Sequence, residues 1–289
     1  MILIDGNSIA ARAFFATHRD TKIFNRDVFV STFLKSFLKV ITDLVDFDTR
    51  IIFCIDARSW RKDFYPEYKE NRKSAKDEVP YYQYIAAYED LAVEMKSLLP
   101  IGIMRKVPYE ADDLVAYYVR KFENSIIVSQ DKDLKVLTDN KNVMYYNFVE
   151  DSMQKVDNPR LFLHRLICAG DGTDNIPSIV PRGEDNKPLF RFGPKTIDAE
   201  YSKDAELFIN DRFVKTKIGK HWEQVKKNYR RNRILIDLDY SPIHDEDLTI
   251  DFKPVYSDKN VGQFFGGYMP DMYQRQASRI QAVMAHYAS

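Results

Sequence analysis

Short apolar runs that lead into aspartates mark the first half of the chain. The three runs are residues 2–4, 51–55 and 126–129. Continuous apolar runs of this length are typical of strands that are covered on both faces in a parallel sheet. Amphipathic segments of helical length lie between them, at residues 28–45, 82–99 and 111–122. The alternation predicts a doubly wound α/β fold, in which the carboxyl ends of the strands meet at one edge.

The character of the chain changes near residue 157. A fourth strand is expected before that point, at residues 143–148, and a helix after it, at residues 160–169. A tight loop is favoured by the glycine-rich and aspartate-rich run that follows. Helical patterns resume from Lys195, and a short helix is expected over residues 273–287. We therefore expect an α/β domain over residues 1–156, and a smaller helical domain with a C-terminal segment over residues 157–289.

The composition is that of a chain that can bury a sizeable core, with 289 residues of which 45% are hydrophobic. Cys54 and Cys168 stand in apolar stretches without metal-ligand spacing, which indicates buried thiols in a reducing compartment. The apolar run at the N-terminus is too short for a signal-peptide core, and no later run approaches the length of a membrane span. We therefore expect a cytoplasmic protein. The 43 basic and 43 acidic residues balance, so the net charge gives no indication of a nucleic-acid partner.

Nine acidic residues stand at strand ends, at one helix start and beside the glycine loop. They are Asp5, Asp56, Glu110, Asp112, Asp113, Asp131, Asp133, Asp171 and Asp174. Singly, each has an ordinary interpretation, because acids cap helix starts and loop aspartates are usually solvated. Gathered at one sheet edge, they would repel one another unless hard cations compensated them. Oxygen ligands without nearby His or Cys point to Mg²⁺ or Mn²⁺, and two such ions can promote phosphodiester hydrolysis.

Positive charge is concentrated in two segments. Residues 58–76 carry seven basic and three acidic residues with four aromatic residues between them, and residues 212–233 carry nine basic residues against one acid. Cations with interleaved aromatic rings suit single-stranded nucleic acid, because phosphates attract cations and every base offers a face for stacking. The alternative interpretation of both segments is a solvated amphipathic helix.

The order of these motifs resembles the 5′-nuclease superfamily, which includes flap endonucleases and polymerase-associated 5′-nuclease domains. The resemblance is carried by Asp5, Asp56, YKENR at 68–72, YEADD at 109–113, QDKD at 130–133 and GDGTDN at 170–175. A closer likeness, to the ribonuclease H group of T-even phages, is carried by WRKDF at 60–64, RGE at 182–184 and LIDLDY at 235–240. The resemblance covers the chain to about Pro242.

The resemblance implies a Rossmann-like, mostly parallel sheet of PIN-like type that carries two divalent metal positions, beside a smaller helix-hairpin-helix domain. The first metal would be held by Asp5, Asp56, Glu110 and Asp112, with Asp131 near both metals. The second would be held by Asp133, Asp171 and Asp174. Asp113 would lie behind these ligands or cap its helix. Lys69 and Arg72 match family cations that approach the scissile phosphate and supplement the charge of the metals.

The resemblance also implies where nucleic acid is bound. Residues 58–90 would form an arch over the active site, and the hairpin region with residues 192–196 would grip duplex phosphates, often around a K⁺ ion. The long stretch 181–191, with the single glycine Gly183, departs from the compact hairpin of the family. The expected nucleic-acid contacts are Arg58, Arg61, Lys62, Tyr68, Gly193, Lys195, Thr196, Lys215, Lys217, Lys226, Lys227 and Arg230.

The functional prediction is a monomeric 5′-nuclease that cuts branched, flapped or RNA-primed DNA. One alternative is a structure-specific binding protein without catalysis, and another is a phosphatase of the same fold class, which would not need the cationic segments. The phage likeness implies primer removal in infected bacterial cytoplasm, with a sliding clamp and a single-strand-binding protein as partners. Residues 262–265 (GQFF) are a candidate clamp contact, although adjacent phenylalanines are more often core.

Overall fold

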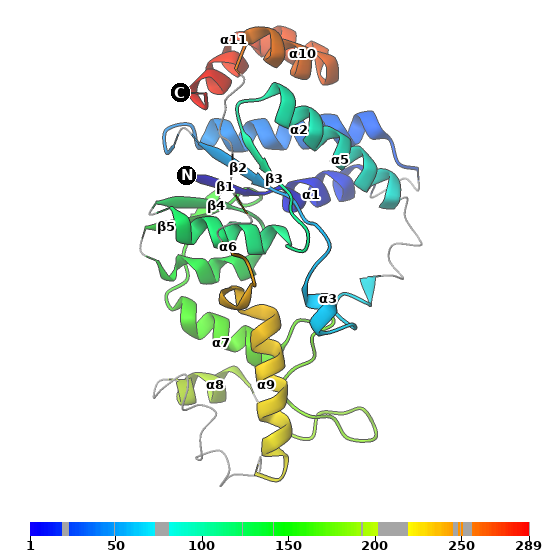
Figure 1. Cartoon of the computed structure of the whole chain (residues 1–289), viewed down its shortest axis with the longest axis vertical. Coiled ribbons are helices and arrows are strands. Elements are labelled where there is room, and N and C mark those ends of the chain that lie inside the picture. Colours follow the sequence, from blue (N-terminus) through cyan, green and yellow to red (C-terminus); the bar gives the residue numbers. More distant parts are fainter. Residues whose placement is uncertain are drawn as a thin grey trace.

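A central sheet of six strands organises the fold (Figure 1). The computed structural model describes residues 1–18, 23–48, 50–72, 81–122, 124–140, 142–191, 193–201, 219–244, 248, 250 and 256–288. In sheet order the strands are β3 (Gly102–Met104), β2 (Ile51–Cys54), β1 (Ile2–Asp5), β4 (Ser125–Val128), β5 (Val143–Asn147) and β6 (Ser152–Gln154). All neighbouring strands are parallel except β6, which runs antiparallel to β5. The predicted mostly parallel sheet is confirmed, and β3 and β6 are strands that the sequence pattern did not indicate.

Helices cover both faces of the sheet. Along β1, Ile2 and Ile4 face one layer and Leu3 the other, because successive side chains of a strand point to opposite sides. The first layer contains α1 (Gly6–His18), α2 (Arg26–Asp43) and α5 (Tyr81–Leu98). The second contains α6 (Ala111–Lys121) and the 3₁₀ helix η1 (Lys132–Asp139). The sheet is therefore buried on both faces, as its continuous apolar runs predict.

Local sequence explains how α2 forms. The side chain of Asn25 accepts a hydrogen bond from the backbone N–H of Val28, which caps the start of the helix. Phe29, Phe33 and Phe37 recur at helical spacing, and all three are fully buried. The helix begins two residues earlier than the apolar pattern indicates because the polar first turn carries no hydrophobic signal.

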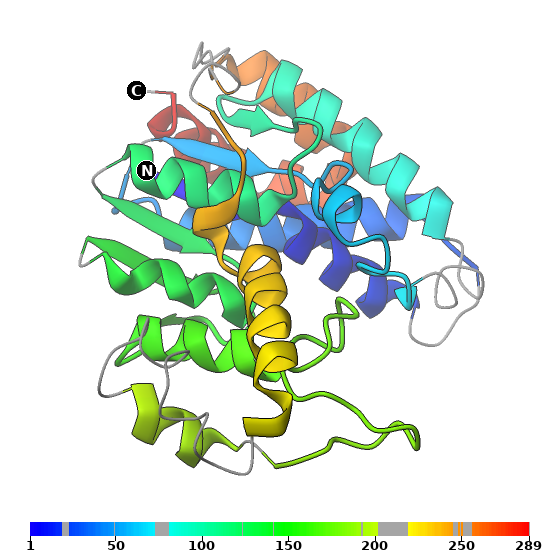
Figure 2. The ribbon, with the colours of Figure 1, turned by 60° about the horizontal axis from the view of Figure 1, so that its bottom comes forward.

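A second group of helices lies below the sheet in the view of Figure 1 and comes forward in Figure 2. It consists of α7 (Pro159–Ala169), α8 (Pro194–Tyr201) and α9 (Trp222–Ile236), with the short η4 (Gly219–His221) and η5 (Leu238–Tyr240) at the ends of α9. A separate small core, with Ile167 and Tyr229 among its members, joins these helices. The helices predicted at residues 160–169 and from Lys195 are confirmed. The division into domains after residue 156 stays a prediction.

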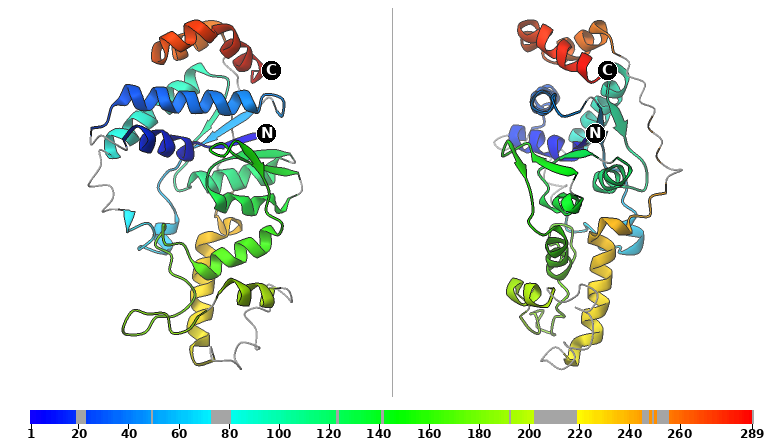
Figure 3. Two further views of the ribbon diagram at one scale, coloured as in Figure 1. Left: turned by 180° about the vertical axis from the view of Figure 1, so that it is seen from behind. Right: turned by 90° about the vertical axis from the view of Figure 1, so that its left-hand side faces the viewer.

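The last described helices return to the sheet domain. α10 (Asp258–Tyr268) and α11 (Pro270–His286) lie against α2 and α5, as both views of Figure 3 show. Phe264 and Phe265 are 1% and 0% exposed and belong to the same core as β1. The interpretation of this phenylalanine pair as core is confirmed, and a clamp contact at residues 262–265 stays a prediction that these two side chains do not support. In the described part of the chain, no helix has both the length and the apolar character that crossing a membrane requires.

Candidate active site

A cavity of about 500 Å³ opens at the carboxyl ends of β1, β2 and β4. Lys69 and Arg72 line it together with the acidic residues expected as metal ligands. Those acids are Asp5, Asp56, Glu110, Asp112, Asp131, Asp133, Asp171 and Asp174. They come from the ends of β1 and β2, from the starts of α6 and η1, and from the loop that follows α7. The fold therefore brings every predicted ligand to one pocket, while the role of each stays a prediction.

Asp5 is fixed where β1 passes directly into α1. Its carboxylate accepts the backbone N–H of Ser8 (3.1 Å), and also the Oγ hydroxyls of Ser8 and Ser129, the latter at 2.8 Å. Gly6 makes this abrupt strand-to-helix junction feasible. A Cβ atom there would lie 2.2 Å from the Phe53 ring and 2.4 Å from the Tyr88 hydroxyl. The close approach of backbone to core thus brings the acid to the pocket wall.

Asp56 is held at both carboxylate oxygens. One oxygen accepts the Asn7 side-chain amide (2.9 Å) and the other accepts the backbone N–H of Ala111 (2.7 Å). Asn7 also accepts the backbone N–H of Asp56 at 2.9 Å. Burial raises the pKa of Asp56 to about 6, against the lowering influence of Lys69. Asn7 therefore orients this acid, a role that the sequence did not indicate because an asparagine beside a strand end is common in loops.

At the start of α6, Asp113 caps the helix whereas Glu110 faces the pocket. The Asp113 carboxylate accepts the backbone N–H of Glu110 (3.0 Å), which is the helix-capping role considered from the sequence. Asp113 is fully buried and does not line the pocket. Glu110 does line it, and receives hydrogen bonds from Ser59 (2.8 Å), Arg61 and Tyr68. Burial opposes ionisation of Glu110, but Lys69 and Arg61 outweigh it and bring the pKa down to about 2.

Within the described part of the chain, Asp112 and Asp133 form no ion pair of the kind that Glu110 makes. Burial and then the charges of Asp131 and Asp5 raise the pKa of Asp112 well above its usual range. Burial and the neighbouring Asp131 raise the pKa of Asp133 to about 7, and its Oδ1 atom is buried without a hydrogen-bond partner. Crowded carboxylates of this kind are the donors that hard divalent cations prefer. As the side chains stand, no three Asp, Glu, His or Cys residues of the described ranges already form a closed metal site.

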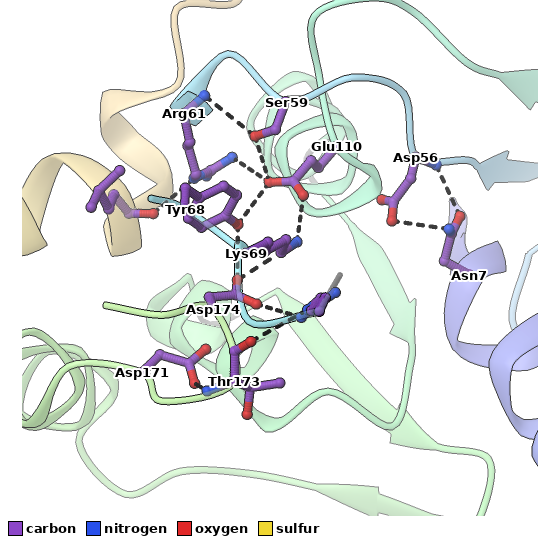
Figure 4. Close-up of polar contacts among 12 residues, drawn as sticks. Asn7, Asp56, Ser59, Arg61, Tyr68, Lys69, Glu110, Asp171, Thr173 and Asp174 are labelled. Atoms are coloured by element: carbon purple, nitrogen blue, oxygen red, sulfur yellow. Dashed lines mark hydrogen bonds and ion pairs between the residues drawn. The ribbon is translucent and has the colours of Figure 1, made fainter. Parts of the chain in front are cut away.

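The cationic segment after β2 reaches across this pocket (Figure 4). Lys69 donates to Glu110, and its Nζ lies 3.6 Å from Asp174. The Tyr68 hydroxyl contacts the same two acids, at 2.9 Å from Glu110 and 2.8 Å from Asp174. Arg72 pairs with Asp174 and also donates to the carbonyl of Thr173 (3.3 Å). The segment thus joins a ligand expected at the first metal to one expected at the second.

Comparison with known proteins decides the family. Residues 1–163 match the family described as 5′-3′ exonuclease, N-terminal resolvase-like domain. The chain belongs to the 5′-3′ exonuclease family. It is 28% identical over 256 residues to DNA polymerase I of Mycobacterium bovis, a match of 82% of this chain to 27% of that protein. The chain therefore spans about a quarter of the length of such polymerase relatives.

Two phage proteins extend the comparison. Ribonuclease H of Enterobacteria phage T4 is 31% identical over 209 residues, which cover 67% of this chain and 66% of that protein. The flap endonuclease of bacteriophage T5, solved with DNA and metal ions, superposes with a TM-score of 0.59 at 20% identity, over 97% of this chain and 98% of that one. The predicted 5′-nuclease superfamily, its fold class and, at the level of the family, its nuclease chemistry are confirmed.

Two expected nucleic-acid contacts of this exonuclease-family chain are buried at the pocket wall, and their contact with nucleic acid stays a prediction. Arg61 and Tyr68 are each 3% exposed. Arg61 pairs with Glu110 and Asp113, and Tyr68 bonds to Glu110, so neither presents its polar group to solvent. A count of charges along the segment could not separate these inward side chains from their outward neighbours.

The remaining expected contacts lie in three places. Arg58 and Lys62 are exposed near α3 (Arg61–Phe64), where Arg58 pairs with Asp63. At α8, Lys195 is exposed, Gly193 precedes the helix, and the side chain of Thr196 lies outside what the structure describes. On α9, Lys227 and Arg230 are exposed, while Lys226 pairs with Glu223 and covers the Trp222 ring. Lys215 and Lys217 lie outside the described residues.

Proposed function

We propose that the chain is a metal-dependent 5′-nuclease that hydrolyses phosphodiester bonds at 5′ ends and single-strand/duplex junctions of DNA or RNA–DNA. One observation carries the proposal: eight acids line one pocket with Lys69 and Arg72 among them. None of the eight acids expected as metal ligands is missing from the pocket, which disfavours a binding protein without catalysis. The chemistry is that of a 5′-3′ exonuclease or flap endonuclease acting on flapped, branched or RNA-primed duplexes.

The donor set fits two Mg²⁺ ions, with Mn²⁺ as a substitute, because it offers only oxygen ligands and contains the unpartnered Oδ1 of Asp133. The first ion would be held by Asp5, Asp56, Glu110 and Asp112. The second would be held by Asp133, Asp171 and Asp174, with Asp131 between the two. When bound, such ions supply an activated water and stabilise the leaving oxygen.

The side chains of the chain itself prepare the reaction in two ways. Asn7 and the Ala111 N–H hold Asp56 in one orientation, so that this ligand needs no rearrangement as substrate arrives. Lys69 and Arg72 place positive charge on the pocket wall, where it can stabilise the negative charge that develops on the scissile phosphate. Both cations must leave their present carboxylate partners to do so.

The substrate would approach along the exposed cations. Arg58 and Lys62 suit the 5′ single strand, and Lys195, Lys227 and Arg230 suit the phosphates of the duplex. K⁺ at the hairpin, a sliding clamp, a single-strand-binding protein and action in the cytoplasm of a phage-infected bacterium stay predictions. The burial of Phe264 and Phe265 removes support for a clamp contact at residues 262–265.

Cleavage of a 5′-end-labelled flap duplex tests the proposal directly. Wild-type protein should release short 5′ products with Mg²⁺ and none with EDTA. Asp112→Asn should be slower by about 100-fold or more, since it removes a charged ligand from the pocket. Asp271→Asn, an exposed acid on α11, is the matched control and should cut like wild type. Tight binding without cleavage of flap, nicked and RNA-primed substrates by folded wild type would instead support a binding protein.

A further inference from the structure

The guanidinium of Arg61 joins three parts of the molecule. Its Nη1 and Nη2 atoms bind the two oxygens of Asp113 at 2.8 and 2.9 Å, and Nη1 also lies 3.1 Å from Glu110. Its Nε donates to the backbone carbonyl of Leu235 at 2.8 Å. The group therefore connects the segment after β2, the start of α6 and the end of α9 (Figure 4).

The contact with α9 has a specific structural cause. Leu235 lies in the last turn of α9, where backbone carbonyls have no partner within the helix. Arg61 supplies that partner from another element, so the end of α9 is fixed relative to α6. Lys227 and Arg230, the exposed cations proposed to hold duplex phosphates, stand on the same helix.

The contact with α6 reaches the pocket. Arg61 binds the Oε2 atom of Glu110, while Lys69 binds Oε1. The Arg61 side chain is only 3% exposed, and an unpaired charge at that depth would be strongly destabilising. The buried carboxylate of Asp113 supplies the compensating negative charge. The planar guanidinium can bond to two acids and a carbonyl in a fixed geometry, whereas a lysine ammonium carries its donors on a single nitrogen and cannot reproduce that geometry.

We propose that Arg61 is a positioning residue that transmits the placement of α9 on a duplex to the Glu110 carboxylate in the pocket. This inference rests on the proposed nuclease function. It assigns Arg61 to neither substrate nor metal contact. A duplex bound to α9 would set the position of the Leu235 carbonyl. Because the planar guanidinium of Arg61 bonds to both groups, it would then set the orientation of Glu110. Duplex binding away from the cut would thereby complete the pocket.

A double-variant experiment tests the coupling. Arg61→Lys keeps the charge and removes the planar guanidinium, and Arg230→Ala removes a phosphate contact on α9. Duplex affinity is measured by fluorescence anisotropy in EDTA, and the single-turnover cleavage rate is measured with Mg²⁺ at saturating flap duplex. In the wild-type background, Arg230→Ala should weaken binding and also slow cleavage. Arg61→Lys alone should slow cleavage by roughly ten- to a hundredfold. In the Arg61→Lys background, Arg230→Ala should weaken binding without slowing cleavage further.

Lys195→Ala on α8 is the matched control, because the partners of Arg61 among the described residues do not include α8. The effect of this substitution on the cleavage rate should be the same in both backgrounds. Equal effects of Arg230→Ala on rate in both backgrounds, including no effect in either, would overturn the proposal. If Arg61→Lys does not fold, Asp113→Asn loosens the same link from the α6 side and has the same two outcomes. Failure of the wild-type protein to cleave at all would count against the proposed function. Anisotropy would show whether such a protein still binds duplex, so this result is distinguishable from a loss of coupling between α9 and the pocket.

Discussion

Removal of the Lys69 charge should change metal binding and cleavage in opposite directions. In the structure, the Lys69 ammonium bonds to Glu110 and lies 3.6 Å from Asp174, so it occupies oxygens that a divalent ion would need. Lys69→Met keeps most of the side-chain volume and removes the competing cation. We therefore expect this variant to bind Mg²⁺ or Mn²⁺ more tightly than wild type when no nucleic acid is present.

The size of the expected change in metal affinity follows from the lowered pKa of Glu110. Burial opposes its ionisation, yet ion pairs with Lys69 and Arg61 bring the pKa from 4.5 to about 2. This difference corresponds to about 3 kcal/mol. If Lys69 supplies about half of it, a divalent ion in the variant no longer competes with this cation, and its affinity should rise by roughly tenfold. Cleavage should nevertheless slow by about 100- to 1,000-fold, because a charge near the scissile phosphate is lost.

Isothermal titration of metal-free protein with Mn²⁺, beside single-turnover cleavage of a flap duplex, measures both effects. Lys62→Met is the matched control for metal binding, since Lys62 lies in the same segment but is exposed and outside the pocket. The control should leave the Mn²⁺ affinity unchanged. An Mn²⁺ affinity of Lys69→Met equal to or weaker than that of wild type would show that Lys69 does not compete with the metal, and would refute the reasoning.

Three further predictions concern stability, each measured by thermal denaturation. Because burial raises the pKa of Asp56 to about 6 and of Asp133 to about 7, their stabilising contribution is present below about pH 4 and is lost as pH rises to 7. Mg²⁺ should therefore raise Tm more at pH 8 than at pH 5, and an equal rise would contradict this. Gly6→Ala should lower Tm, because its methyl group would lie within 2.6 Å of core rings; an unchanged Tm would show that the junction relaxes freely. Phe264→Ala should cost about 3–5 kcal/mol, while the exposed Gln263→Ala should cost little. Equal effects of these two substitutions would exclude a core role for α10.

The parts of the fold that could be predicted from the sequence are those with a strong local pattern of apolar residues. Continuous apolar runs predict strands buried on both faces, and β1, β2 and β4 lie where those runs stand. Parallel strands in turn place the residues that follow them at one edge, which is why the acids of the pocket could be grouped before any geometry was known. Chemistry that depends on residue type and strand order is therefore accessible from sequence.

Other features depend on tertiary packing and escape such patterns. β3 has only three residues and, within the described ranges, pairs with β2 alone, so its apolar signal is too short to recognise. α10 includes Gly266 and Gly267, which local propensity disfavours in a helix, but burial of its phenylalanines against the sheet domain offsets that preference. The inward direction of Arg61 likewise depends on where Asp113 and Leu235 meet in space.

The placement of α10 and α11 also bears on how the protein is made. The Tyr287 hydroxyl bonds to the carbonyl of Ile41 across a sequence separation of 246 residues, and Met284 is completely buried beside it in the core. Contacts between such distant positions form slowly, because the intervening chain must first be brought together. During synthesis, a chain that has not yet emerged as far as residue 258 leaves the outer faces of α2 and α5 open to solvent. The layer of α2 and α5 can therefore be covered only after α10 and α11 have emerged from the ribosome.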